Sequence, residues 1–128
     1  KKSKTFLTRV SFSLTQSQWG DDKKQLRYSP KEIANLYFEK KFVDFTVSLN
    51  SHYTGEMISM YSYPNNNIIP ENIVTSVHIS KKYQFQNIEP ILTLSILNIL
   101  DKQHESSKGY PEPGRTVGFK ITLKQKRK

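Results

Sequence analysis

Two short motifs in the chain pair a histidine with a hydroxyl two residues later, His52-Tyr53-Thr54 and His78-Ile79-Ser80. An imidazole exchanges protons near neutral pH, and a hydroxyl beside it can hold an oxyanion. Two such motifs facing each other could therefore cleave a phosphodiester. The alternative is a histidine in an exposed turn at position 52 and one on the polar side of a strand at position 78. His52 and His78 are the candidate catalytic residues.

The two motifs resemble those of the two-histidine phosphoesterases, and the resemblance covers six residues. In that family each motif lies on a strand, in a separate half of the fold. The resemblance implies a phosphate held between the two imidazoles.

The sequence predicts no metal site and no cofactor. Zinc needs three or four ligands from histidine, cysteine or carboxylate, and the chain has no cysteine. Asp101, His104 and Glu105 lie close together, but at the expected end of a helix, where polar residues are typical of a solvated terminus. A glycine-rich phosphate loop and a Gly-x-Ser-x-Gly motif are both missing from the sequence.

The positive charge of the chain is concentrated at its two ends. The formal net charge is +9. Seven of the cations lie in segments without acidic residues, and the remaining residues, 5–123, carry a net charge of only +2. Such ends favour a polyanionic partner, although solubilising or targeting extensions look the same. Together with a third cluster, they give the candidate phosphate-contacting residues Lys1, Lys2, Lys4, Lys81, Lys82, Lys124, Lys126, Arg127 and Lys128.

Aromatic residues near these cations could stack on nucleobases, as they do on single-strand and RNA-binding sheets. The alternative is that the tyrosines line the edge of the core with their hydroxyl groups in water. The candidates are Trp19, Phe42, Tyr53, Tyr61 and Tyr63.

Apolar residues alternate with polar ones in several segments, which predicts half-buried strands. The expected strands are 5–16, 42–49, 56–63, 72–80 and 115–124. Ser29-Pro30-Lys31-Glu32 has the form of a capping box with proline at the first helical position, and Ile33, Leu36 and Tyr37 follow at helical spacing. These features predict a helix that ends at Lys40 and Lys41.

A second helix is expected from Ile88 to about Lys102, with Asn87 as its cap and Pro90 in its first turn. Apolar residues cover most of its circumference, so it should form the centre of the core. The predicted order is β-α-β-β-β-α-β, an α+β two-layer sandwich with a mostly antiparallel sheet of about five strands. The length of 128 residues predicts a single domain with short basic ends, 1–4 and 124–128.

The predicted α-β-β-β-α order of residues 30–102 is similar to that of a double-stranded-RNA-binding domain. In that family a basic cluster between the third strand and the second helix contacts phosphates, and Ser80-Lys81-Lys82 has the corresponding position.

The sequence is compatible with three functions. The first is a non-enzymatic nucleic-acid-binding module, with RNA placed ahead of DNA, that contacts phosphates through its basic ends. The second is a protein-protein interaction domain that belongs to a larger assembly, and the third is a phosphodiester-cleaving enzyme such as a toxin-like nuclease. No apolar run approaches the ~20 residues of a membrane-spanning helix, so no membrane span is predicted.

Overall fold

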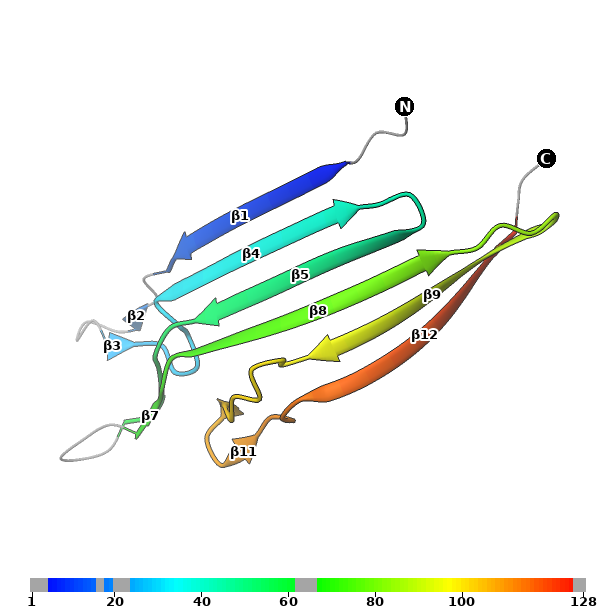
Figure 1. Ribbon diagram of the computed structural model, residues 1–128. Coiled ribbons are helices and arrows are strands. Elements are labelled where there is room, and N and C mark those ends of the chain that lie inside the picture. Colours follow the sequence, from blue (N-terminus) through cyan, green and yellow to red (C-terminus); the bar gives the residue numbers. More distant parts are fainter. Residues whose placement is uncertain (1–4, 16–17, 20–23, 62–66, 126–128) are drawn as a thin grey trace.

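The computed structural model of the chain describes residues 5–15, 18–19, 24–61 and 67–125, and every regular element in these ranges is a strand. Six long strands form one antiparallel sheet in the order β1-β4-β5-β8-β9-β12 (Figure 1). Their bounds are Phe6–Leu14 (β1), Glu32–Lys41 (β4), Phe45–Thr54 (β5), Asn72–Lys82 (β8), Ile88–Leu97 (β9) and Thr116–Gln125 (β12). The prediction of an α+β sandwich is therefore wrong, because the fold is all-β.

The two ends of the sheet differ in the length of their connections. At one end, β4 joins β5 through residues 42–44 and β8 joins β9 through residues 83–87. This is the short-turn end, where β1 begins and β12 ends (Figure 1). The other is the long-loop end, whose connections contain three small hairpins. These hairpins pair Gln18–Trp19 (β2) with Lys24–Gln25 (β3), Met57–Met60 (β6) with Asn67–Ile69 (β7), and Glu105–Ser107 (β10) with Tyr110–Pro111 (β11).

The first predicted helix is strand β4, which pairs with β1 on one side and β5 on the other. The helical spacing of Ile33, Leu36 and Tyr37 overlaps with a second pattern of period two through Ala34, Leu36 and Phe38. Both patterns use Leu36, and pairing with two neighbouring strands favours the period of two. Here the first three residues of the expected capping box precede a strand, and Glu32 is the first residue of that strand.

The second predicted helix is strand β9. Its apolar run is short and rich in isoleucine, which suits a strand as well as a buried helix, so periodicity alone cannot separate the two. Pro90 is opposite Leu123 of β12, and the pairing of β9 with β8 begins only at Ile91. The proline therefore lies beyond the stretch of β9 that is paired on both sides, where a missing N–H is tolerated.

Three of the strand predictions are confirmed closely by β1, β8 and β12. The segment 42–49 overlaps with β5, which starts later and continues to Thr54. Of the predicted strand 56–63, the described residues 56–61 include the short β6, which ends at Met60.

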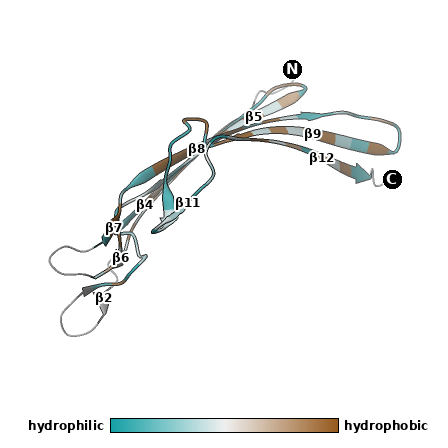
Figure 2. Ribbon diagram, turned by 90° about the horizontal axis from the view of Figure 1, so that it is seen from below, coloured by the Kyte–Doolittle hydropathy of each residue, from teal (hydrophilic) through white to brown (hydrophobic). Residues whose placement is uncertain are grey.

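The sheet is a single curved layer, and Figure 2 shows it nearly edge-on. Among the described residues, the buried side chains lie at the long-loop end: Met57, Ser59, Ile69 and Asn98. The core expected around residues 88–102 does not form, and Leu97, which should have been central to it, is 43% exposed. Within the described ranges, no second layer of strands packs across the six long strands.

Candidate functional site

One face of the sheet is apolar from edge to edge. Residues opposite each other in adjacent antiparallel strands point to the same side, so the register identifies this face, which we call the apolar face. Figure 2 shows the resulting alternation as brown and teal bands along β9 and β12. Its apolar members are Phe6, Val10, Phe12 and Leu14 in β1, Leu36 and Phe38 in β4, Phe45, Val47 and Leu49 in β5, Ile73, Val77 and Ile79 in β8, Leu92, Leu94 and Ile96 in β9, and Val117, Phe119, Ile121 and Leu123 in β12.

Many of these side chains are largely exposed, most of all in the edge strands, where Val10 is 70% and Leu123 is 68% exposed. Six strands about 4.8 Å apart and about 34 Å long give the face an area of roughly 1000 Å². Covering that area would be worth up to about 25 kcal/mol at ~25 cal/mol per Å². Exposed apolar patches larger than a few hundred Å² are rare on monomeric soluble proteins and mark interaction surfaces. The apolar face is therefore the candidate interaction surface of this chain.

The apolar face carries few polar groups, and the central ones are neutral. By register, its charged residues are Glu32, Lys40 and Lys81, all near the ends of their strands. The hydroxyls of Ser51 and Thr75 lie side by side near the middle of the face and hydrogen-bond to each other at 3.0 Å. One hydroxyl donates to the other, so each of the two groups has a hydrogen-bond partner in these apolar surroundings.

The opposite face, which we call the polar face, is rich in hydroxyl, amide and imidazole groups that bond across strands. His52 Nδ1 lies 2.6 Å from Asn35 Oδ1, and His78 Nδ1 lies 2.8 Å from Ser95 Oγ. A third cross-strand pair joins the hydroxyls of Ser80 and Thr93 at 2.9 Å. Such pairs hold adjacent strands in register.

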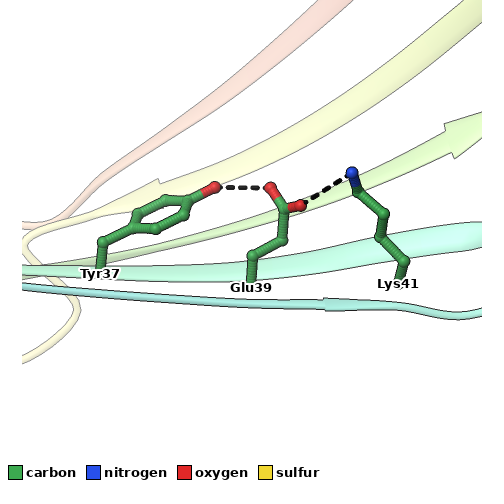
Figure 3. A network of polar contacts seen from close by, with 3 residues as sticks. All are labelled: Tyr37, Glu39 and Lys41. Atoms are coloured by element: carbon green, nitrogen blue, oxygen red, sulfur yellow. Dashed lines mark hydrogen bonds and ion pairs between the residues drawn. The ribbon is translucent and has the colours of Figure 1, made fainter. Parts of the chain in front are cut away.

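A chain of three polar residues runs along the polar face of β4 (Figure 3). The Tyr37 hydroxyl donates a hydrogen bond of 2.6 Å to the Glu39 carboxylate, which forms an ion pair of 3.2 Å with Lys41. These residues are two positions apart, so they share one side of the strand. Lys82 on β8 forms a comparable ion pair of 2.6 Å with Glu89.

The two candidate catalytic histidines do not face each other. His52 lies in β5 and not in the turn expected for it, while His78 lies in the adjacent strand β8. Both are on the polar face, but the residue opposite His78 is Ser48, four positions from His52. Four residues along neighbouring strands correspond to about 14 Å, too far for one phosphate to bridge the two rings.

The candidate phosphate-contacting residues lie only partly within the described ranges. Lys1, Lys2, Lys4, Lys126, Arg127 and Lys128 lie outside them. Lys81, Lys82 and Lys124 lie at the short-turn end, with Lys81 on the apolar face and the other two on the polar face. Strands β1 and β12 form opposite edges of the sheet and are not neighbours, so about five strand spacings, or ~24 Å, separate them.

The predicted stacking aromatics are scattered. Phe42 lies in a short turn and Tyr53 lies on the apolar face, where its hydroxyl donates a 2.7 Å hydrogen bond to Glu71. Tyr61 follows the β6 strand at the long-loop end. Trp19 belongs to β2, whose side chains are not described, and Tyr63 lies outside the described residues. These residues form no common stacking surface.

A hollow of about 240 Å³ opens on the polar face near the long-loop end. Its lining includes His52, His104, Glu105 and Glu112. Within the described ranges, no three histidine or acidic residues are arranged so that they could hold a metal ion. The same part of the chain contains no helix of the length and apolarity needed to cross a membrane.

The apolar face is the functional feature that the motif-based interpretation missed. Its signal was present in the sequence as six segments of nine to eleven residues with alternating apolar positions. Two of these segments were interpreted as helices, which hid the continuity of the face. Comparison with protein-family models and with curated proteins gives no match for this chain.

Proposed function

We propose that this chain is part of a membrane-embedded sheet, whose strands cross the hydrocarbon layer with the apolar face against lipid acyl chains and the polar face against water. The observation that carries the proposal is the continuous, exposed apolar face of a single-layer sheet. The hydrogen-bonded polar face opposite it suits an aqueous environment. A sheet with one lipid-facing and one water-facing side has this alternation of apolar and polar residues along each strand.

The length of the strands supports a membrane as the occupant. The six long strands have 9, 10, 10, 11, 10 and 10 residues. Strands of about 9–11 residues cross a hydrocarbon layer of ~30 Å when they are tilted. Short turns at one end and longer loops at the other are also typical of sheets that cross a membrane.

The stagger of the strands supports a tilt. A row of opposite residues can be followed across the sheet from Val10, the middle residue of β1. It reaches the last strand near Arg115, just before β12 begins. The middle of β12 lies five to six residues further on, at Lys120 and Ile121. This offset of about 18 Å across about 24 Å of sheet corresponds to a tilt of roughly 35–40°. Membrane sheets have strands tilted by about 35–45°.

The scarcity of polar groups on the apolar face favours lipid over a protein partner. Protein interfaces contain about one hydrogen bond per 100–200 Å², so a face of this size would use about five to ten. Away from the strand ends, the polar side chains that the register places on this face are Thr8, Ser51 and Thr75, and the last two are bonded to each other. Acyl chains require no hydrogen bonds.

In a membrane, both edges of the sheet must be paired. In the described structure, β1 pairs only with β4 and β12 pairs only with β9. Unpaired backbone groups in hydrocarbon cost several kcal/mol each, so an open edge is not stable there. Further strands must therefore pair with the outer edges of β1 and β12, and in assays of the purified chain only other copies of the chain can supply them.

The experiment compares tryptophan reporters on opposite faces of one strand. Trp19 is replaced by phenylalanine, and either Ile121→Trp or Thr122→Trp is introduced into the purified chain in phosphatidylcholine vesicles. The reporter at position 121 should have blue-shifted emission that is quenched by brominated acyl chains, while the reporter at 122 should be quenched by aqueous acrylamide. Equal quenching of the two reporters would contradict the proposal. Association of the chain with other proteins and not with vesicles would support the protein-interaction domain instead.

A further inference from the structure

Two lysines lie on the apolar face at its short-turn end. Lys40 of β4 is opposite Phe6 and Val47, and Lys81 of β8 is opposite Phe45 and Leu92. Each occupies the second-last position of its strand. If the apolar face contacts acyl chains as proposed above, both lysines lie where hydrocarbon gives way to the headgroup layer.

The surroundings of these two lysines differ from those of their immediate neighbours. Lys41 and Lys82, on the polar face, form ion pairs with Glu39 and Glu89. Within the described part of the chain, no carboxylate lies within ion-pair distance of Lys40 or Lys81. Two cations on an apolar surface thus lack the counter-charge that the adjacent lysines have.

Aromatic rings hold both ammonium groups toward the turn. Lys40 Nζ lies 5.3 Å from the centre of the Phe42 ring, and Lys81 Nζ lies 5.0 Å from the centre of the Tyr83 ring. Both rings belong to the short turns, so the lysine side chains extend away from the middle of the apolar face. Lysines near the end of a membrane-crossing element direct their charge to the interface in this way, and aromatic residues are enriched at the same level.

An apolar hollow lies beside Lys81. Tyr83, Phe85, Pro90 and Leu92 line a space of about 240 Å³ at the short-turn end. Tyr83 is the ring that contacts Lys81, so a cationic and an apolar surface adjoin. A molecule with an anionic group and an attached hydrocarbon chain would satisfy both.

We propose that Lys40 and Lys81 bind the headgroup phosphates of anionic phospholipids at the short-turn end of the sheet. This inference rests on the proposed membrane location of the apolar face. Lysine is a good point-charge partner for phosphate, and an anionic headgroup supplies the missing counter-charge. One basic residue near an anionic membrane surface contributes enough to change local lipid preference about fivefold.

The test measures which lipid lies next to each lysine. In a Trp19→Phe background, Phe6→Trp reports on Lys40, because Phe6 is opposite Lys40, and Phe85→Trp reports on Lys81. The chain is placed in mixed vesicles of phosphatidylglycerol and phosphatidylcholine in which either one or the other lipid is brominated. The ratio of the two quenching efficiencies gives the local preference for the anionic lipid. We expect a preference of about fivefold at each reporter.

Matched substitutions distinguish a site from a general effect of charge. Lys40→Gln should abolish the preference at Phe6→Trp and leave it unchanged at Phe85→Trp, and Lys81→Gln should do the reverse. Lys41→Gln and Lys82→Gln remove the same charge from adjacent positions on the other face and should change neither. Equal losses from all four substitutions, or no preference in the parent, would overturn the proposal. Loss of the preference on addition of inorganic phosphate would also overturn it, since the site would then bind a soluble anion.

The two proposals fail in different ways. Quenching of both reporters by brominated phosphatidylcholine, without any preference for phosphatidylglycerol, would reject the headgroup site and leave the membrane location intact. No quenching by either brominated lipid would reject both.

Discussion

A cation placed in the middle of the apolar face should separate a lipid environment from an aqueous one. Val77 lies near the middle of β8 and is opposite Leu49 and Ile96, all on the apolar face. Ser76 precedes it on the same strand and points to the polar face, opposite Asn50. The variants Val77→Arg and Ser76→Arg therefore differ mainly in the face that receives the charge.

The expected difference is large. An arginine on the lipid side of a membrane sheet costs about 2–4 kcal/mol near the middle of the hydrocarbon layer. This lowers the equilibrium constant for folding about 30- to 800-fold, at one factor of ten per ~1.4 kcal/mol. In water, an arginine on an already solvent-accessible face changes stability by about 0.5 kcal/mol or less. Ser76→Arg should stay within that smaller range.

The measurement is reversible unfolding by urea from phosphatidylcholine vesicles, followed by circular dichroism of the sheet. The free energy of unfolding is extrapolated to zero denaturant for the parent and both variants. A loss of less than about 1 kcal/mol for Val77→Arg, or equal losses for the two variants, would refute the lipid-facing assignment. In detergent-free buffer the same pair of variants shows how much of the effect arises without a membrane.

Three further predictions concern individual contacts. Ser51→Ala leaves the Thr75 hydroxyl without its partner on the apolar face and should lower the free energy of unfolding by about 1–3 kcal/mol. Ser51→Ala combined with Thr75→Val removes both hydroxyls and should cost less than the single change in the same urea titration. Asn98 is buried, has a φ of 50° and hydrogen-bonds through its side chain to the backbone of the loop that follows β9. Asn98→Gly should keep the backbone geometry and lower the free energy of unfolding by about 1–3 kcal/mol, and Asn98→Ala should lower it more. Equal losses in the urea titration would show that the backbone is not strained. Gly109 has a φ of +81°, and the space around its α-carbon is open. Gly109→Ala should therefore destabilise the β10–β11 hairpin by about 1 kcal/mol through the backbone conformation alone. Unchanged hydrogen exchange in that hairpin would contradict this expectation.

Local alternation in the sequence was sufficient to predict several strands. β1, β8 and β12 follow from period-two patterns in which every second residue is apolar, because only a half-buried strand places such residues on one side. The antiparallel pairing was also predicted from the polar side of each strand, and the register confirms it.

The sequence misled where two periods coexist. Leu36 belongs both to the helical spacing of Ile33, Leu36 and Tyr37 and to the alternation that continues to Phe38. In β9, isoleucine and leucine occupy both sides of the strand near Ile91, so no period is clean. In both segments hydrogen bonds to two flanking strands decide the outcome, and those partners are remote in sequence.

The candidate site shows the same division. The sequence by itself determined which residues share one side of a strand, that the chain has no cysteine, and that its ends are positively charged. The tertiary structure alone decided that His52 and His78 are four positions out of register, that Lys40 and Lys81 share the apolar face, and that six strands lie in one layer with nothing over that face in the described structure. Sequence periodicity records which side of its own strand a residue occupies. Strand order, register and the number of layers depend on contacts between distant segments, and no local pattern contains them.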